Sequence, residues 1–474
     1  MKSDLWTRLI EYGDRAFIWQ YTKDLNKERS SVIPSQNITS TLIKEVEAVV
    51  ADISSLNDSS SAKLNIFIAE SNPVKFLTAF LGAIISEVRI FLCDPNWQQQ
   101  EWRQVLSLVE PDSIFAESGI KDLISHIKLP TSKPEQLETN SCSESLIMIP
   151  TGGSSGKIKF AIHTWATLEA SVIGFQKYFD CQKINSCCTL PLYHVSGLMQ
   201  FMRSFSTQGN LILCNYQLIK KFPSIHNSSD FFISLVPTQL QFIIDTNPTW
   251  LKKFKTILLG GASIPRSLLV QAREHNLPLA PIYGMTETAS GIVALKPEDF
   301  LEGNNSNGLV LPHAKIVIDA PTNKPGAIAL ECQSLCYGYY PKFFQQSNFI
   351  ATDDVGYLDS EGYLHLVGRN SQKIITGGEN VFPAEVEEVI LATKLVKDVC
   401  VLGISDRRWG QAVTALYIPI QSDLNLDWIK QKIGLQLSKY KQPKHWLKVD
   451  TLPRNDRGKI DYDKARAIAC KLIK

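Results

Sequence analysis

Short apolar runs alternate with helix signals along the first two thirds of the chain. In the segment 72–85, the helix-capping residue Asn72 is followed by proline and then by an apolar stripe. Residues 88–94, VRIFLCD, have the composition of a buried strand. The same alternation returns at 231–244 and at 256–276, where two glycines separate the apolar run from the helix signal. Strand, glycine turn and helix in this order predict an α/β fold with mostly parallel sheets.

The pattern changes after about residue 368. Residues 356–369, GYLDSEGYLHLVGR, predict a β-hairpin that turns at Ser360-Glu361-Gly362. A glycine loop, a helix beginning at Pro383, two strand-like runs and a helix over 427–438 follow. These elements predict a separate α+β unit of about 100 residues.

Composition and charge exclude several classes of protein. The chain is 44% hydrophobic and 20% charged, and its 21 Phe, 14 Tyr and 9 Trp supply ample apolar surface to bury, which excludes disorder. Its 49 basic and 47 acidic residues give a net charge of +2, too balanced for a nucleic-acid or membrane-surface protein defined by bulk charge. Residues 430–474 hold 13 basic and 4 acidic side chains, so this end carries +9 and the rest carries −7. A solvated basic face is the simplest interpretation of that excess.

The cysteines and the N-terminus indicate a cytoplasmic protein with reduced thiols. Ten cysteines in 474 residues do not make a disulfide scaffold, and their spacings match no zinc or redox motif. The first residues carry charges where a signal peptide needs an apolar core. The longest apolar run, 76–85, is too short to span a bilayer, so we expect no integral membrane segment.

The most informative local motif is TGGSSGKIK at residues 151–159, which follows the strand-like run SLIMIP. Small residues let backbone N–H groups approach phosphate oxygens, while hydroxyls and lysines add donors and positive charge. The motif is not a Walker A loop, because Ile158 follows Lys157 where that loop needs serine or threonine. On this segment alone, a flexible surface loop is the alternative interpretation.

Further motifs follow in order, and each is ambiguous by itself. They are YGMTET at 283–288, TDD at 352–354, Gly368-Arg369 with GGEN at 377–380, and LPRNDRGKI at 452–460. Taken together, the order and spacing of the motifs resemble the adenylate-forming acyl-CoA synthetase superfamily over nearly the whole chain.

The resemblance implies a domain organisation and a reaction. It implies a large N-terminal domain over 1–368, a hinge at 369–372 and a small mobile C-terminal domain over 373–474. It further implies ATP, Mg²⁺ and coenzyme A as a co-substrate, with an acyl-adenylate formed first and a thioester second. The partners would be small molecules and not nucleic acid, and the resemblance leaves a homo-oligomer open.

The resemblance also assigns roles to individual residues. ATP binding would fall to Thr151, Ser154, Ser155, Gly156, Lys159, Gly260, Gly261, Ala262, Tyr283, Gly284, Met285, Thr286, Asp354 and Arg369. Glu287 would hold magnesium, Lys459 would reach the nucleotide from the small domain as a catalytic group, and Gly377 with Gly378 would line the coenzyme A site. Three positions depart from the usual pattern: Gly153 replaces serine or threonine, Ile158 replaces proline, and Asp353 replaces glycine.

Charge supports these assignments. A carboxylate that attacks the α-phosphate of ATP brings two anions together, so a cation such as Lys459 must neutralise the approach. The second step needs a thiol rather than this lysine, and a rotation of the small domain would exchange Lys459 for Gly377 and Gly378. The basic segment 430–474 would suit the phosphates of coenzyme A.

Residues 189–205, TLPLYHVSGLMQFMRSF, give information about which carboxylic acid would be activated. His194 resembles the family's gate between nucleotide and acyl pocket, a catalytic and substrate-binding position, although a structural histidine is the alternative. Arg203 is a lone basic residue in a helix that otherwise reads as buried, so it requires an anionic partner from the fold or from the substrate.

Combined with SLVPTQLQ (234–241), LLGGASIP (258–265), TGGEN (376–380) and Ser371 at the hinge, this segment resembles the o-succinylbenzoate-activating ligases of menaquinone and phylloquinone biosynthesis. That acid has two carboxylates, and Arg203, helped by Ser234 and Thr151, would anchor the aromatic one. Another aryl- or acyl-CoA ligase is the first alternative. A catalytically silent adenylate-binding module is the second, and the intact Lys459, Glu287 and Asp354 argue against it.

Overall fold

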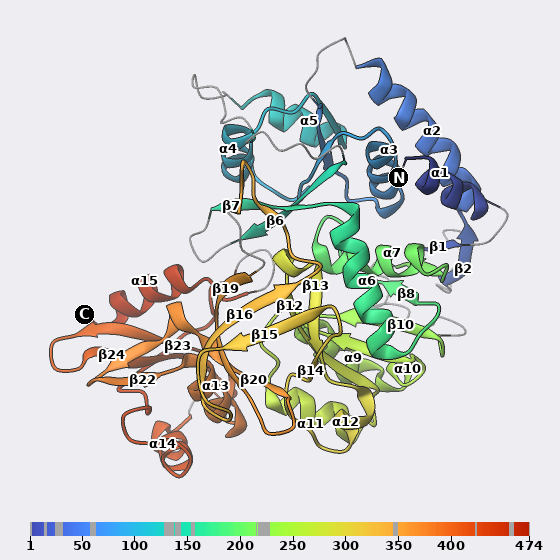
Figure 1. Ribbon diagram of the computed structural model, residues 1–474. Helices are drawn as coiled ribbons and strands as arrows, with labels where there is room; N and C mark the ends of the chain where they lie inside the picture. The colour runs from blue at the N-terminus through green and yellow to red at the C-terminus, as the bar shows by residue number, and fades with distance from the viewer. Residues whose placement is uncertain are drawn as a thin grey trace.

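The computed structural model describes residues 2–13, 17–23, 32–56, 63–127, 137, 144–152, 157–214, 216, 228–344, 349–421, 424–454 and 459–473. Over these residues the strands form four sheets, of nine, seven, four and five strands (Figure 1). The first three sheets belong to the N-terminal part of the chain, and the fourth belongs to the C-terminal part.

The largest sheet has a parallel centre and antiparallel edges. In spatial order its strands are β14 (Leu309–Val310), β13 (Ser290–Ala294), β12 (Leu279–Met285), β11 (Thr256–Leu259), β10 (Phe231–Leu235), β8 (Asn185–Cys188), β9 (Leu211–Leu213), β1 (Ile18–Lys23) and β2 (Val32–Asn37). The six strands from β12 to β1 run parallel, whereas β13, β14 and β2 pair antiparallel with their neighbours.

The seven-stranded sheet follows the same plan. Its order is β18 (Lys342–Phe343), β17 (Gly338–Tyr339), β7 (Ile158–His163), β6 (Leu146–Gly152), β4 (Arg89–Leu92), β3 (Asn65–Ala69) and β5 (Ser113–Ala116). The strands β6, β4, β3 and β5 are parallel, and β7, β17 and β18 continue the sheet antiparallel. The strand predicted over 88–94 is therefore confirmed, and β4 forms its central part.

Helices cover these two sheets and join them. They are α1 (Lys2–Glu11), α2 (Thr39–Ser55), α3 (Pro73–Ile85), α4 (Gln99–Leu108), α5 (Ser118–Ser125), α6 (Trp165–Phe179), α7 (Val195–Ser206), α9 (Pro237–Thr246), α10 (Pro248–Leu251), α11 (Arg266–Glu274) and α12 (Pro297–Leu301). One hydrophobic cluster combines residues of α2, α3, α6 and α7 with residues of both sheets.

Helix α3 shows how the sequence builds this core. The Asn72 side chain accepts hydrogen bonds from the backbone N–H groups of Val74 and Lys75, at 2.9 and 3.2 Å, as its capping position predicts. Every residue from Phe76 to Ile85 is buried. A helix that is apolar on all sides is stable only inside the protein, which explains its place between other elements.

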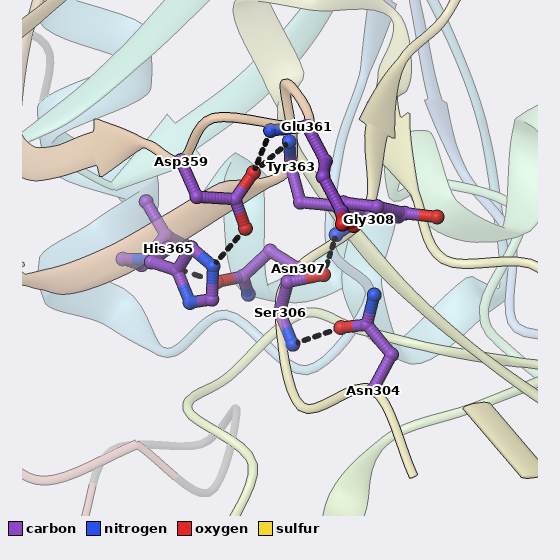
Figure 2. A network of polar contacts seen from close by, with 9 residues as sticks. Asn304, Ser306, Asn307, Gly308, Asp359, Glu361, Tyr363 and His365 are labelled. Carbon is purple, nitrogen blue, oxygen red and sulfur yellow. Dashed lines mark hydrogen bonds and ion pairs between the residues drawn. The ribbon is translucent and has the colours of Figure 1, made fainter. Parts of the chain in front are cut away.

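The third sheet is antiparallel and contains β15 (Ala314–Ile318), β16 (Gly326–Cys332), β19 (Phe349–Leu358) and β20 (Leu364–Arg369). The predicted hairpin is confirmed as β19–β20. Asp359 holds its turn, accepting from the backbone of Glu361 and Tyr363 and contacting His365 Nε2 at 2.8 Å (Figure 2). The loop 304–308 is fastened to β20, because Asn307 accepts from the backbone N–H of Leu366 at 2.9 Å.

The C-terminal unit, orange to red in Figure 1, has its own sheet and its own hydrophobic clusters. Its elements are β21 (Ile374–Thr376), β22 (Glu379–Val381), α13 (Pro383–Ala392), β23 (Val396–Asp406), β24 (Gly410–Pro419), α14 (Leu426–Gly434), β25 (His445–Lys448) and α15 (Tyr462–Ile473). The predicted fold class, a large α/β part followed by a smaller α+β part, is confirmed.

The predicted hinge residues 369–372 lie between β20 and β21, where a short 3-10 turn, η2, spans Asn370–Gln372. The division of the chain at 368 and 373 stays a prediction. Between the two parts, Arg266 of α11 pairs with Glu388 of α13 at 3.7 Å. Over the described ranges, no helix is long and apolar enough to cross a membrane.

Candidate active site

The predicted site residues gather where parallel strands end. Thr151 lies at the carboxyl end of β6, Ser234 near that of β10, Tyr283 near that of β12, and Gly260 directly follows β11. In open α/β sheets, ligands bind at the carboxyl ends of the strands. The fold therefore brings residues from motifs more than 100 positions apart to one edge of the sheets.

Tyr283, Asp354 and Arg369 form one chain of contacts. The Tyr283 hydroxyl donates to Asp354 Oδ2 at 2.8 Å, and Arg369 Nε lies 3.2 Å from Asp354 Oδ1. Asp354 faces Arg369 across the β19–β20 pair, so the hairpin register fixes this contact. Burial, followed by the Asp354 carboxylate, raises the pKa of Tyr283, so the phenol stays protonated and keeps donating. The structure thus unites three residues assigned to the nucleotide.

The segment 284–290 connects β12 to β13 through a strained turn. A Cβ on Gly284 would lie 2.0 Å from the Ser290 carbonyl oxygen, so only glycine permits this close approach. The short 3-10 turn η1 (Thr286–Thr288) is followed by Ala289 and Ser290 with positive φ values of 49° and 85°. Non-glycine residues adopt this region rarely, and such strain persists only where the surroundings hold it.

Three side chains from other elements hold the carbonyl groups of this turn. Ser171 donates to the Ala289 oxygen and Ser334 donates to the Thr288 oxygen, both at 2.8 Å. His163 Nε2 lies 2.9 Å from the Thr286 oxygen. Burial lowers the pKa of His163 to about 4, so the ring is neutral at physiological pH and donates through Nε2–H. No motif in the sequence marked His163.

Glu287 lies in this turn and is buried. The Tyr339 hydroxyl donates to Glu287 Oε1 at 2.8 Å, and Lys159 Nζ lies 5.1 Å from the centre of the Tyr339 ring. Tyr339 therefore links the predicted metal ligand to the strand that follows the phosphate loop. Sequence reasoning missed Tyr339, because it lies 52 positions from Glu287.

The residues present fit a magnesium ion that arrives with ATP. Among the described residues, no group of three or more His, Cys, Asp or Glu side chains could hold a metal by itself. Magnesium in nucleotide sites is typically held by one or two carboxylates, substrate phosphates and water, so one carboxylate such as Glu287 suffices.

His194 caps the N-terminal end of α7, and its Nε2 lies 3.7 Å from Asp94 Oδ2. Tyr193 contacts the His194 ring edge to face at 4.7 Å between centroids. Ser234 is half-buried, and its carbonyl accepts from Thr189 at 3.0 Å. The contacts with Asp94 and Tyr193 hold the His194 ring in place.

Arg203, on α7, is 3% exposed. Its guanidinium lies 4.2 Å from the Phe175 ring centre, one terminal nitrogen donates to Ser290 Oγ at 3.3 Å, and Nε has no hydrogen-bond partner. Among the described acidic side chains, none forms an ion pair with Arg203. Burial lowers the pKa of Arg203 to about 10, so it remains a cation at physiological pH. The fold therefore buries a positive charge that no acidic side chain within the described ranges neutralises.

The remaining predicted residues fall in three groups. Ser154, Ser155 and Gly156 lie outside the described residues. Gly260, Gly261, Ala262, Met285 and Thr286 are half-buried or exposed at the strand ends. Lys459 is exposed, and Tyr462, three positions later, lies near Arg369.

The predicted coenzyme A glycines lie beside an aromatic residue that sequence reasoning missed. Gly377 and Gly378 have positive φ values of 62° and 87°, and the Gly377 N–H donates to the Trp409 carbonyl at 2.8 Å. Lys444 Nζ lies 4.7 Å and Arg408 Cζ 4.9 Å from the Trp409 ring centre. Two cations and one aromatic ring therefore lie beside the predicted coenzyme A glycines.

Comparison with known proteins defines the class. The AMP-binding enzyme family matches residues 62–340, and the AMP-binding enzyme C-terminal domain matches residues 385–459. The chain belongs to the AMP-binding enzyme family, which confirms the resemblance drawn from its motifs.

Individual curated relatives show which enzymes of this family the chain resembles in sequence. The chain is 32% identical to the 2-succinylbenzoate–CoA ligase of Enterococcus faecalis over 76% of this chain and 77% of that protein. It is 33% identical to that of Listeria monocytogenes over 70% and 72%, and 29% identical to that of Bacillus subtilis over 78% and 76%.

Solved structures agree on the fold. The Bacillus subtilis o-succinylbenzoate CoA synthetase in complex with the acyl-adenylate intermediate matches with a TM-score of 0.78 at 23% identity, covering 98% of this chain and 97% of that one. ATP-bound MatB from Rhodopseudomonas palustris matches with a TM-score of 0.80 at 18% identity, covering all of both chains.

Glu287→Gln tests the metal assignment. We expect the variant to need a higher Mg²⁺ concentration for adenylate formation, because the amide keeps the shape of the side chain but loses its charge. ATP–pyrophosphate exchange measured across a magnesium titration checks this. Tyr339→Phe is the matched control, since it removes the hydrogen bond to Glu287 but leaves the carboxylate. An unchanged magnesium dependence in Glu287→Gln would show that the metal is held elsewhere.

Proposed function

We propose that this protein is an AMP-forming ligase that activates 2-succinylbenzoate with ATP and transfers the acyl group to coenzyme A, in menaquinone or phylloquinone biosynthesis. The observation that supports this substrate is the buried Arg203, which has no carboxylate partner in the part of the chain that the structure describes. Arg203 contacts Ser290, at the end of the turn that bears Glu287. A second substrate carboxylate would neutralise this charge, whereas a fatty acid would leave it unpaired. The three curated relatives described above are 2-succinylbenzoate–CoA ligases, which supports the same acid.

In the first half-reaction, a carboxylate oxygen of the succinyl group attacks the α-phosphorus of ATP and pyrophosphate leaves. Tyr283, Asp354 and Arg369 would hold the nucleoside, and Thr151, Lys159 and the phosphate loop would hold the phosphates. Magnesium, held by Glu287, would neutralise the phosphate charge. Lys459 would neutralise the approach of carboxylate and α-phosphate, the largest electrostatic obstacle in this step.

In the second half-reaction, the thiol of coenzyme A attacks the carbonyl carbon of the mixed anhydride and AMP leaves. This step does not bring a carboxylate and a phosphate together. Lys459 is therefore not needed to neutralise their charges, and it can leave the site. A rotation at 369–372 would bring Gly377, Gly378 and Trp409 toward the adenylate. The basic excess of residues 430–474 suits the phosphates of coenzyme A.

We place the reaction in the cytoplasm. Each cysteine within the described ranges is a free thiol, and most are buried. A reducing compartment fits this state. Thioester formation measured across a panel of aromatic and aliphatic acids tests the function as a whole, and 2-succinylbenzoate is expected to be the preferred acid.

Lys459→Ala separates the two half-reactions. We expect it to abolish acyl-adenylate formation and largely spare thioester formation from pre-made adenylate, because only the first step brings two anions together. Single-turnover assays of each half-reaction check this. Equal losses in both steps would mean that Lys459 supports the fold or both conformations.

The contact between Asp353 and Ser371 predicts an effect on the hinge. Asp353 Oδ1 accepts from the Ser371 backbone N–H at 2.9 Å, and Asp353 Oδ2 accepts from its hydroxyl. Together these contacts tie η2 to β19. We expect Asp353→Gly to free the hinge and change the ratio of the two half-reaction rates several-fold, with Ser371→Ala giving a smaller change in the same direction. A constant ratio would contradict the hinge assignment.

Arg203→Ala tests the substrate. Charge-assisted hydrogen bonds contribute about 1.5–3 kcal/mol, so we expect the KM for 2-succinylbenzoate to rise roughly ten- to a hundredfold while that for ATP stays nearly constant. Arg203→Lys should restore binding only in part, because lysine lacks the planar pair of donors.

Arg273→Ala is the matched control for Arg203. Arg273 also lies over an aromatic ring, Phe300, at 4.3 Å, but it is satisfied by two backbone carbonyls and Asn305. Its removal should lower the melting temperature without selectivity between substrates. If Arg203→Ala behaves in the same way, the guanidinium serves the fold and the anchor lies elsewhere.

A further inference from the structure

A second buried residue with unsatisfied polar atoms, His313, lies close enough to Arg203 to be affected by its charge. His313, between β14 and β15, is 6% exposed, and neither of its ring nitrogens has a hydrogen-bond partner among the residues that the structure describes. An imidazole carries one donor and one acceptor when neutral, so both capacities are buried and unused. In native proteins such groups are nearly always completed by ordered water, a ligand or an ion, so the imidazole can still bind a polar group from outside the chain.

Helix α6 places His313 and Arg203 in one cluster. A Cβ on Gly174 would lie 1.8 Å from His313 Nδ1, so the helix backbone packs directly against the imidazole. The next residue, Phe175, lies under the Arg203 guanidinium. Two consecutive residues of one helix thus contact the two unsatisfied groups, and Gly174 is required for the imidazole to fit.

We propose that His313 is a positioning residue for the second carboxylate of the substrate, which it holds together with Arg203, and that it takes up a proton from solvent when the acid binds. This inference rests on the proposed function, because it assumes an acid with two carboxylates. The cluster has one positive charge without the acid. The carboxylate neutralises that charge, and a proton on His313 would turn its contact with the carboxylate into a charge-assisted hydrogen bond, which is stronger than one from a neutral ring.

The surroundings of His313 agree with this account. Burial, followed by the charge of Arg203, lowers the pKa of His313 to about 4, so the ring is neutral before the acid arrives. His313 also lines a cavity of about 600 Å³, whose other titratable lining groups are Lys315, Glu331, Cys332, Cys336 and Tyr337. Lys315 and Glu331 lie 3.9 Å apart as an ion pair, and α6 contributes the hydroxyl of Thr167 but no charge. Arg203 is thus the cation that acts on His313, and a bound carboxylate would counter its effect.

Calorimetry detects the proton. Binding of 2-succinylbenzoate to the whole enzyme, measured near pH 7 in buffers of different ionisation enthalpy, should show proton uptake in the wild type and none in His313→Gln. His126→Gln is the matched control, because His126 is an exposed histidine at the end of α5 and should leave the uptake unchanged. Equal uptake in the wild type and His313→Gln would overturn the proposal.

A substrate analogue isolates the second carboxylate. We expect His313→Phe to weaken binding of 2-succinylbenzoate about tenfold and to leave ATP binding unchanged. 4-Oxo-4-phenylbutanoate, which lacks only the ring carboxylate, should bind the variant and the wild type alike. Equal losses for both acids, or a loss for ATP as well, would show a purely structural role. Should the phenylalanine variant fail to fold, His313→Gln carries the same comparison.

The outcomes separate this inference from the proposed function. A wild-type enzyme that neither binds nor adenylates 2-succinylbenzoate overturns both. A wild-type enzyme that uses the acid normally, with His313 variants that also bind it normally, overturns only the role of His313.

Discussion

The turn at 284–290 is the constraint on which the rest of the site depends. It follows Tyr283 directly, contains Glu287 and ends at Ser290, so the residues proposed to contact the nucleoside, magnesium and the acid lie on one short stretch of chain. Its positive φ values make it unfavourable in isolation. Hydrogen bonds from β7, α6 and the segment after β16 hold its carbonyl groups, so both large sheets must be assembled before the site exists.

This dependence explains which features the sequence could predict. Local signals predicted α3 from its asparagine cap, the hairpin β19–β20 from its turn residues, and the alternation of β10, α9, β11 and α11 from periodicity. The order of the motifs predicted the family, and it assigned Tyr283, Asp354 and Arg369 to one nucleotide site. The contacts among these three residues in the structure agree with that grouping. Each of these signals lies within a few neighbouring residues, or in a motif whose spacing is fixed by the reaction.

The residues that sequence reasoning missed are those defined by contacts between distant elements. Tyr339 matters because it meets Glu287, and His163 because it meets the Thr286 carbonyl 123 positions away. Gly174 looks like an ordinary glycine in a helix, yet its missing side chain makes room for His313. Pairing of this kind depends on the packed structure, and no local pattern in a single sequence encodes it.

The buried cation shows how specificity and stability oppose each other here. A guanidinium out of water and without a carboxylate destabilises the folded chain, and a hydrophobic residue of similar volume would relieve that cost. Phe175 and Ser290 offset part of it, but Nε stays unsatisfied. The same unsatisfied group favours an acid with a second carboxylate over one that ends in an apolar group, since only the former restores charge balance. Because Arg203 contacts Ser290 in the turn that bears Glu287, an acid bound at Arg203 would lie close to the segment that carries the proposed metal ligand. Binding of the second substrate carboxylate and formation of the adenylation site would then stabilise the same backbone conformation, that of the turn at 284–290.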